Sequence, residues 1–216
     1  VETMGAESWM NLNRWRRWMC RLIGLVDCRF WRSFLLRIGW WGKSWAQMNL
    51  PALNSAVIAG VLKAQNPDVN LVSAPIVAKE RGIQISTTRQ DKTGTFDAYI
   101  KVTMVTEKRE RSVAGTCFSD GKPRFIQIKG INIDAEIGAH MLYTANADVP
   151  GTIGLLGMTM GKNHVNIANF TLGRSGIGKE AIAILYLDQA IDPKVVNTLE
   201  STGMFQQVMP LHFEVA

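Results

Sequence analysis

Five residues in the last third of the chain have the types and spacing of a binding site for a small charged molecule. They are Asn146, Asp148, Pro150, Gly151 and Asn166. Pro150 suits the first turn of a helix, and the free N–H groups of that turn attract a carboxylate. Asp148 can accept an ammonium group, and both Asn amides can donate and accept hydrogen bonds. Together these residues predict a site for a zwitterion, that is, an amino-acid effector.

A purely structural interpretation of the same residues stays open. Asp148 can simply cap the helix, and the two Asn side chains can hold turns. Residue types alone favour this interpretation. No Ser/His/Asp, Cys/His or paired-carboxylate arrangement stands out in the sequence, so we predict no catalytic residue in this chain.

One glycine-rich segment comes within a residue of a phosphate-binding loop. In Gly173–Glu180 the required Ser or Thr, whose hydroxyl binds Mg²⁺, is replaced by Glu180. The residues after Lys179 alternate as in a strand, so no helix N-terminus faces a phosphate there. We predict a hairpin turn and no nucleotide site.

A second group of glycines falls on the helix predicted after Pro150. The group comprises Gly151, Gly154, Gly157 and Gly161. They lack the GxGxxG order of a dinucleotide site, and we expect a helix whose missing side chains let a sheet or a partner approach closely.

Histidine and cysteine give no metal or disulfide signal. The three His residues share no ligand spacing with one another or with Cys117, so we predict no metal site. The three Cys residues are odd in number and form no CxxC pair, which favours a reducing, cytoplasmic location. These residues are His140, His164, His212, Cys20, Cys28 and Cys117.

Composition divides the chain near residue 45. The whole chain carries a net charge of +6, and residues 1–45 hold 8 Lys/Arg, 3 Asp/Glu and all seven Trp. The basic charge therefore lies at one end, and we predict no nucleic-acid partner. No apolar run reaches the length of a spanning helix, so no membrane partner is predicted either. We interpret residues 1–45 as an aberrant or disordered leader, with a basic amphipathic helix around Arg14–Arg21 as the alternative.

Residues 46–137 read as an α+β domain with a largely antiparallel sheet. Asn49-Leu50-Pro51 opens one helix and Ser73-Ala74-Pro75 opens a second. From Ile83 the apolar period changes from 3.6 to 2, which indicates strands. Asp120-Gly121 is typical of a hairpin turn.

Residues 138–216 predict a βαββαβ order, that is, a ferredoxin-like unit. Strands are expected at 140–145, 165–172, 181–187 and 205–215. The first helix follows Pro150, and Asp192-Pro193 caps the second.

Several segments resemble a known family. NADVPG, VNIANFTLGR and the closing LHFEV resemble an ACT domain, an amino-acid-sensing regulatory module. MNLPALNSAVIAGVL, VSAPIVAKERGI and IKGINIDAEIGAHMLYTANADVPG resemble the allosteric substrate-binding (intervening) domain of long-form D-3-phosphoglycerate dehydrogenase. The resemblance covers roughly residues 46–216.

The resemblance implies a regulatory region of an enzyme of L-serine biosynthesis. Its parent oxidises 3-phosphoglycerate with NAD, and L-serine sits between two ACT domains. Polar residues of the first loop, here Asn146 and Asp148, hold the effector together with Asn166 of a neighbouring subunit. The chain is thus expected to self-associate through its ACT domain. The family's NAD-binding domain and catalytic Arg/Glu/His set have no counterpart here, so we expect no turnover by this chain alone.

Two alternatives remain. The regulatory half of an iron–sulfur L-serine dehydratase combines similar domains, but Cys117 alone cannot supply the cluster ligands. A free-standing ACT protein would act only through partner contacts.

Overall fold

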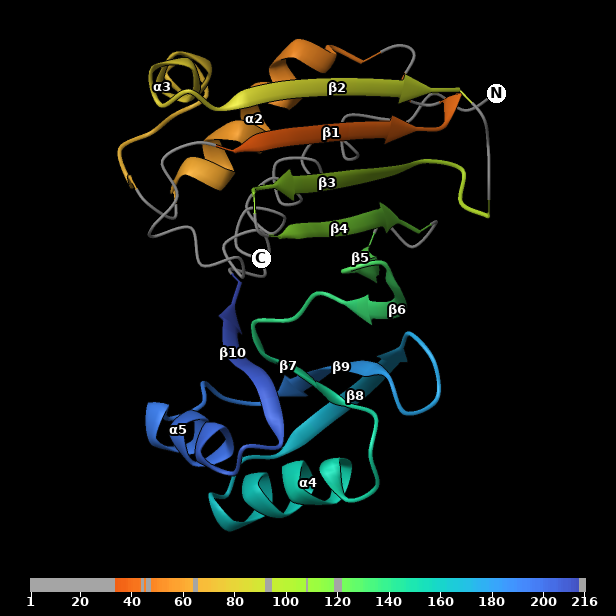
Figure 1. Ribbon diagram of the computed structural model, residues 1–216, viewed down its shortest axis with the longest axis vertical. Helices are drawn as coiled ribbons and strands as arrows, with labels where there is room; N and C mark the ends of the chain where they lie inside the picture. Colours follow the sequence, from red (N-terminus) through yellow and green to blue (C-terminus); the bar gives the residue numbers. More distant parts are fainter. Residues whose placement is uncertain are drawn as a thin grey trace. The chain divides into compact units, whose positions relative to one another are not determined.

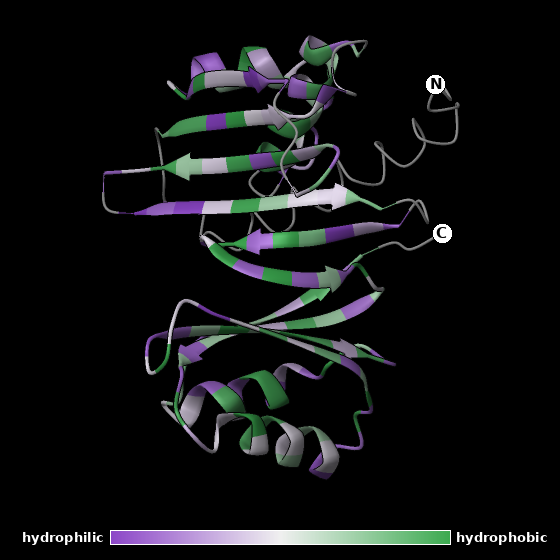
Figure 2. Cartoon of the chain, turned by 90° about the vertical axis from the view of Figure 1, so that its right-hand side faces the viewer, coloured by the Kyte–Doolittle hydropathy of each residue, from purple (hydrophilic) through white to green (hydrophobic). Residues whose placement is uncertain are grey.

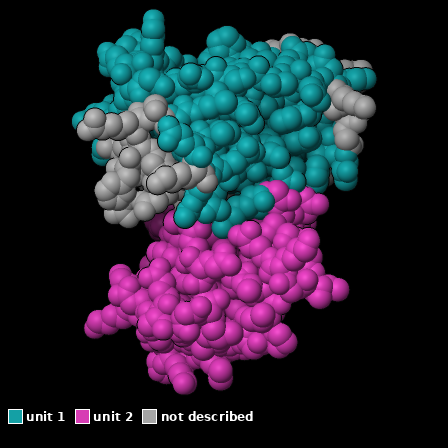
Figure 3. All heavy atoms as spheres, viewed as in Figure 1, with its two compact units in different colours: residues 1–129 teal, residues 130–216 magenta. Residues whose placement is uncertain are grey.

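The chain forms two compact units, residues 1–129 and 130–216 (Figure 3). The structure, a computed structural model, describes residues 34–213 apart from 44, 46–47, 64–65, 92–94, 108 and 119–121. Strands dominate both units, which confirms the α+β class. The compact units divide after Lys129, whereas β6 (Ile131–Glu136) is hydrogen-bonded into the six-stranded sheet, so the domain boundary expected at 137/138 stays a prediction.

The first unit contains a mixed sheet and two helices (Figure 1). Its strands lie in the order β2-β1-β3-β4-β5, and the sheet continues into β6. Strands β1 and β2 are parallel, and the pairs β1–β3, β3–β4 and β4–β5 are antiparallel. Apolar and polar residues alternate along these strands, as the banded colours of Figure 2 show. The elements are β1 (Leu35–Trp41), α2 (Leu50–Lys63), α3 (Ala74–Glu80), β2 (Gln84–Gln90), β3 (Tyr99–Val105), β4 (Glu110–Cys117) and β5 (Pro123–Ile128).

Strand β1 corrects the interpretation of residues 1–45 as an aberrant or disordered leader for the part that contains Leu35–Trp41, whereas residues 1–33 lie outside the described residues. It lies between β2 and β3, and Leu36, Ile38 and Trp40 on one of its faces are each at most 2% exposed. A parallel neighbour of this kind needs a crossover, which α2 and α3 supply between β1 and β2. The folded part therefore begins by residue 34, not at 46.

Helix α2 is tied to this sheet by an asparagine. Asn54 accepts a hydrogen bond from Trp40 Nε1 at 3.0 Å and donates one to Thr87 Oγ1 at 3.1 Å. Each partner stands on a different strand, so a single amide fixes α2 against β1 and β2. Both predicted helices are confirmed.

The second unit has the predicted βαββαβ order. Its four-stranded sheet runs β10-β7-β9-β8, antiparallel throughout, which is the strand order of a ferredoxin-like unit. The elements in this order are β7 (His140–Ala147), α4 (Thr152–Lys162), β8 (Ile167–Arg174), β9 (Glu180–Leu187), α5 (Pro193–Ser201) and β10 (Phe205–His212). Residues 130–216 also include β6 (Ile131–Glu136), which precedes this order and is a strand of the six-stranded sheet.

Both helices cover one face of this sheet (Figure 1). Leu142 of β7 and Leu185 of β9 are fully buried there, together with Leu156 of α4 and Leu199 of α5. Asp192 caps α5 as predicted, because its side chain accepts a hydrogen bond from Lys194 N at 2.8 Å.

The glycines of α4 are exposed, and the expectation that the sheet packs closely against them is wrong. A Cβ added at Gly154, Gly157 or Gly161 meets nothing within 4 Å. The helix instead faces the sheet with Leu156 and Met160. The sheet therefore does not contact α4 at these glycines.

Gly173, by contrast, permits a close approach by β6. A Cβ built there lies 2.6 Å from the carbonyl oxygen of Asn132 and 2.9 Å from Ile131 Cγ2. Because a Cβ points out of the plane of its sheet, β6 lies over the face of the sheet at this position.

We expect Gly173→Ala to lower the free energy of unfolding by about 1–3 kcal/mol, because the methyl group overpacks this contact. Gly157→Ala is the matched control, since its methyl group meets open space. It should raise stability by about 0.5–1 kcal/mol through helix propensity. Urea denaturation measures both, and equal effects would contradict the assigned contact.

Three predictions lie outside the described residues: the Asp120-Gly121 turn, the Arg14–Arg21 helix, and any role of Cys20 and Cys28. Within the described ranges, no helix is both long and apolar enough to cross a membrane.

Candidate effector site

Three segments of the second unit meet at one end of its sheet. They are the end of β7, the start of α4 and the turn between β8 and β9. Asp148 N donates to Lys179 O at 2.7 Å, which joins the first segment to the turn. The predicted hairpin is confirmed, since Ser175 N also donates to Glu180 O at 2.9 Å.

Asp148 points at this turn instead of capping α4. Its Oδ2 accepts hydrogen bonds from Gly178 N at 3.2 Å and Arg174 Nη1 at 3.4 Å. The predicted cap is therefore wrong: the N-cap residue is Gly151, which has no side chain to accept a bond. The Asp148 side chain is 22% exposed and Arg174 is 57% exposed, so solvent screens the ion pair and its contribution is small.

The first turn of α4 is open at its N-terminus. Gly151 has a φ of 94°, a left-handed conformation that favours glycine. Leu155 N donates to Gly151 O, which is the first hydrogen bond of the helix. The N–H groups of the three residues before Leu155 therefore have no acceptor within α4. Pro150 and Gly151 are both exposed. This turn can therefore receive an anionic group.

Asn146 supports the loop from inside. It is 4% exposed, and its Nδ2 donates to Ala147 O at 2.6 Å. A buried amide satisfied in this way fixes the end of β7, and it does not present its N–H to solvent.

Asn166 lies at the other end of the sheet. Its Nδ2 donates to Asp188 Oδ2 at 2.7 Å, beyond the last residue of β9, whereas Asp148 sits beside the first. Strand geometry places these two ends more than about 20 Å apart. The structure thus brings Asn146, Asp148, Pro150 and Gly151 together within one chain and leaves Asn166 apart.

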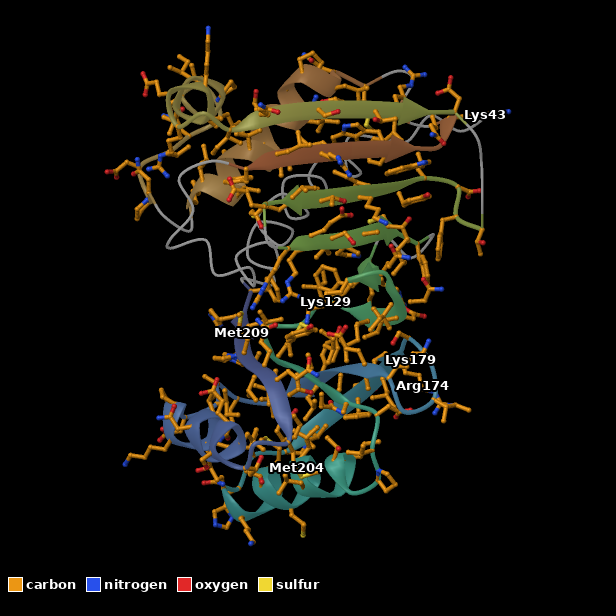
Figure 4. The ribbon with its side chains drawn as sticks, in the orientation of Figure 1. Lys43, Lys129, Arg174, Lys179, Met204 and Met209 are labelled. Carbon is orange, nitrogen blue, oxygen red and sulfur yellow. The ribbon has the colours of Figure 1, made fainter. Side chains whose placement is uncertain are left out.

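Gly178 and Arg174 were missed as members of this site. Arg174 is the last residue of β8 and Gly178 lies in the β8–β9 turn; Figure 4 shows Arg174 and Lys179 at the same end of this hairpin. The glycine itself was the available sequence signal, since glycine favours a positive φ and Gly178 has a φ of 70°. That conformation frees its N–H to reach the carboxylate across the loop.

Comparison with known proteins identifies the first unit. Residues 35–129 match the model of the D-3-phosphoglycerate dehydrogenase intervening domain. This part of the chain belongs to that family. The match begins at the first residue of β1, which independently supports β1 as part of the intervening domain.

Whole proteins with this domain resemble a larger part of the chain. D-3-phosphoglycerate dehydrogenase of Bacillus subtilis is 33% identical over 155 residues, which are 71% of this chain and 30% of that protein. Its counterpart in Synechocystis is 33% identical over 152 residues, 70% of this chain and 27% of that protein. The chain thus spans about a third or less of the length of these dehydrogenases.

A second kind of protein is also similar. The probable L-serine dehydratase beta chain of Bacillus subtilis is 24% identical over 153 residues, 71% of this chain and 70% of that protein.

The similarity extends beyond the intervening domain. The first unit ends at residue 129, and the Bacillus dehydrogenase matches 155 residues of the chain. The match must therefore include part of the second unit. About 70% of the chain is homologous to the regulatory region of D-3-phosphoglycerate dehydrogenases.

Proposed function

We propose that the chain is the regulatory region of a D-3-phosphoglycerate dehydrogenase and that its second unit is an ACT domain binding an amino-acid effector, L-serine first among candidates. The open first turn of α4 beside the Asp148 carboxylate carries this proposal. Among the described residues, Arg174 and Gly178 both donate to Oδ2 of Asp148. Its Oδ1 can therefore accept a hydrogen bond from the ammonium group of the effector. The effector carboxylate then meets the N–H groups of the helix start.

Asn166 joins this site only from a second copy of the chain. Strand β8 is an edge of its sheet, and Leu172 on it is 42% exposed. When the β8 edges of two copies pair about a two-fold axis, the two β8 strands run in opposite directions. The start of one β8 then lies beside the end of the other, so the partner's Asn166 reaches the Asp148 end. Burial of the effector between two copies couples its binding to their association.

Calorimetry with L-serine tests the effector. The full chain must be used, because a fragment that starts at Met48 lacks β1. We expect binding of L-serine and none of serinamide, which lacks the carboxylate, or of 3-hydroxypropionate, which lacks the ammonium group. The absence of heat at millimolar L-serine with a folded chain contradicts the proposal. Binding of serinamide and 3-hydroxypropionate with the same affinity as L-serine contradicts it as well.

A second candidate is the regulatory subunit of an L-serine dehydratase. Coverage favours it, since the chain spans 70% of the dehydratase beta chain but 30% of the Bacillus dehydrogenase. An antibody against residues 130–216 separates the two in the source organism. If the chain belongs to a dehydrogenase, the antibody should detect a polypeptide roughly three times as long as the matched region. If it belongs to a separate dehydratase subunit, the polypeptide should be only roughly 1.4 times as long as the matched region.

A further inference from the structure

The fold brings two of the three histidines together across neighbouring strands. His140 opens β7 and His212 closes β10, and the two are direct partners in the antiparallel register. Their rings stack with centroids 4.8 Å apart, and the two Nδ1 atoms lie 3.1 Å apart. The residues are 72 positions apart in the chain, so their sequence spacing gave no metal signal.

This separation of the Nδ1 atoms fits ligation of one metal ion. Two imidazole nitrogens at about 2.05 Å from a metal lie about 2.9 Å apart at a right angle and about 3.3 Å apart at the tetrahedral angle. The observed 3.1 Å falls between these values. The same distance also allows a single N–H···N hydrogen bond between the two rings, and a neutral imidazole nitrogen that carries no proton can act as a metal ligand.

The backbone holds the pair in place from both sides. On one side of the histidine pair, Leu211 pairs with Met141. On the other side, Phe213 N donates to Ala139 O at 2.9 Å. His140 is half-buried and His212 is exposed, so an ion can enter from solvent. The pair stands at the opposite end of β7 from Asp148, and its role is independent of the effector site.

We propose that His140 and His212 chelate a divalent transition-metal ion, of which Zn²⁺ and Ni²⁺ are the probes. Each ring binds through Nδ1 and carries its proton on Nε2, so no proton needs to leave a neutral pair. Among the described residues, no group of three or more His, Cys, Asp or Glu side chains forms a metal site. Water can fill further coordination positions, as in sites with open positions.

Nuclear magnetic resonance of the untagged full chain tests this directly, because the chain has only three histidines. Paramagnetic Ni²⁺ should broaden the Cε1–H signals of His140 and His212 together and leave that of His164 unchanged. Calorimetry with zinc sulfate should give one site per chain. Broadening of all three signals alike, or of neither member of the pair, overturns the proposal.

Variants provide the second measurement. His140→Ala and His212→Ala should each weaken Zn²⁺ binding at least about tenfold, because the second ligation is no longer intramolecular. His164→Asn is the control, since Asn tolerates the positive φ of 56° at that position, and it should bind as the unaltered chain does. Unchanged affinity in both Ala variants would contradict chelation, and the experiment on the unaltered chain does not depend on how the variants fold.

Discussion

Trp40→Ala is expected to destabilise the first unit by about 3–5 kcal/mol, as do other removals of large buried aromatic rings. Trp40 is 2% exposed, and its ring packs edge-on against Trp45 with centroids 4.7 Å apart. The substitution also removes the donor to Asn54 Oδ1, so the link from β1 to α2 is lost.

Native-state hydrogen exchange of amides in β1–β5 measures this loss. Arg37→Ala is the control on the same strand: its side chain is 54% exposed and lies 3.8 Å from Glu110, so it should change stability by less than about 0.5 kcal/mol. If both substitutions have the same small effect, β1 is not an inner strand of the sheet.

Asp148→Asn is expected to weaken L-serine binding by about 10- to 100-fold. The amide oxygen of Asn can still accept the hydrogen bond from Gly178 N, so the loop keeps its shape. The charge that pairs with the effector ammonium group is lost, and a hydrogen bond to a charged group contributes about 1.5–3 kcal/mol.

Asp192→Asn is the matched control for this substitution. It also removes one carboxylate, but Asn caps α5 as well as Asp does, and the residue lies outside the proposed site. Calorimetry with L-serine compares the two variants. Wild-type affinity in Asp148→Asn would rule out a direct contact between this carboxylate and the effector.

The second unit was largely predictable from sequence because its local signals agree. Asp192-Pro193 starts α5, the alternation in Ala181–Leu187 gives β9, and Gly203 ends α5 with a φ of 69°. Turn chemistry, period and capping all favour one topology there, and the four strands follow.

Strand β1 was not predicted, because the Trp- and Arg-rich composition of residues 1–45 drew attention away from its alternating apolar pattern. In LLRIGWW the residues Leu36, Ile38 and Trp40 alternate with Leu35, Arg37 and Gly39, which is a strand pattern. The neighbouring Trp and Arg residues made the segment look like a leader. Gly39 also fits the structure, because the ring of Trp41 lies where its Cβ would be.

The partners of Asp148 were not predictable from local sequence. Asp two residues before Pro is typical of a helix cap, and only the tertiary fold brings Gly178, thirty residues later, within 3.2 Å of its carboxylate. The His140–His212 pair shows the same limit, since strand pairing joins residues that no motif connects. Long-range geometry decides both arrangements.

Mixing two binding-defective variants tests whether two copies of the chain share the effector pocket. Asp148→Asn and Asn166→Ala are purified separately, each shown to bind L-serine poorly, then mixed in equal amounts under conditions that allow exchange. Half of the dimers are then mixed, and each mixed dimer has one site with both residues intact. If the pocket is shared, the mixture should recover about a quarter of the binding capacity of the unaltered chain. Full loss in the mixture, with exchange demonstrated, would contradict a shared pocket.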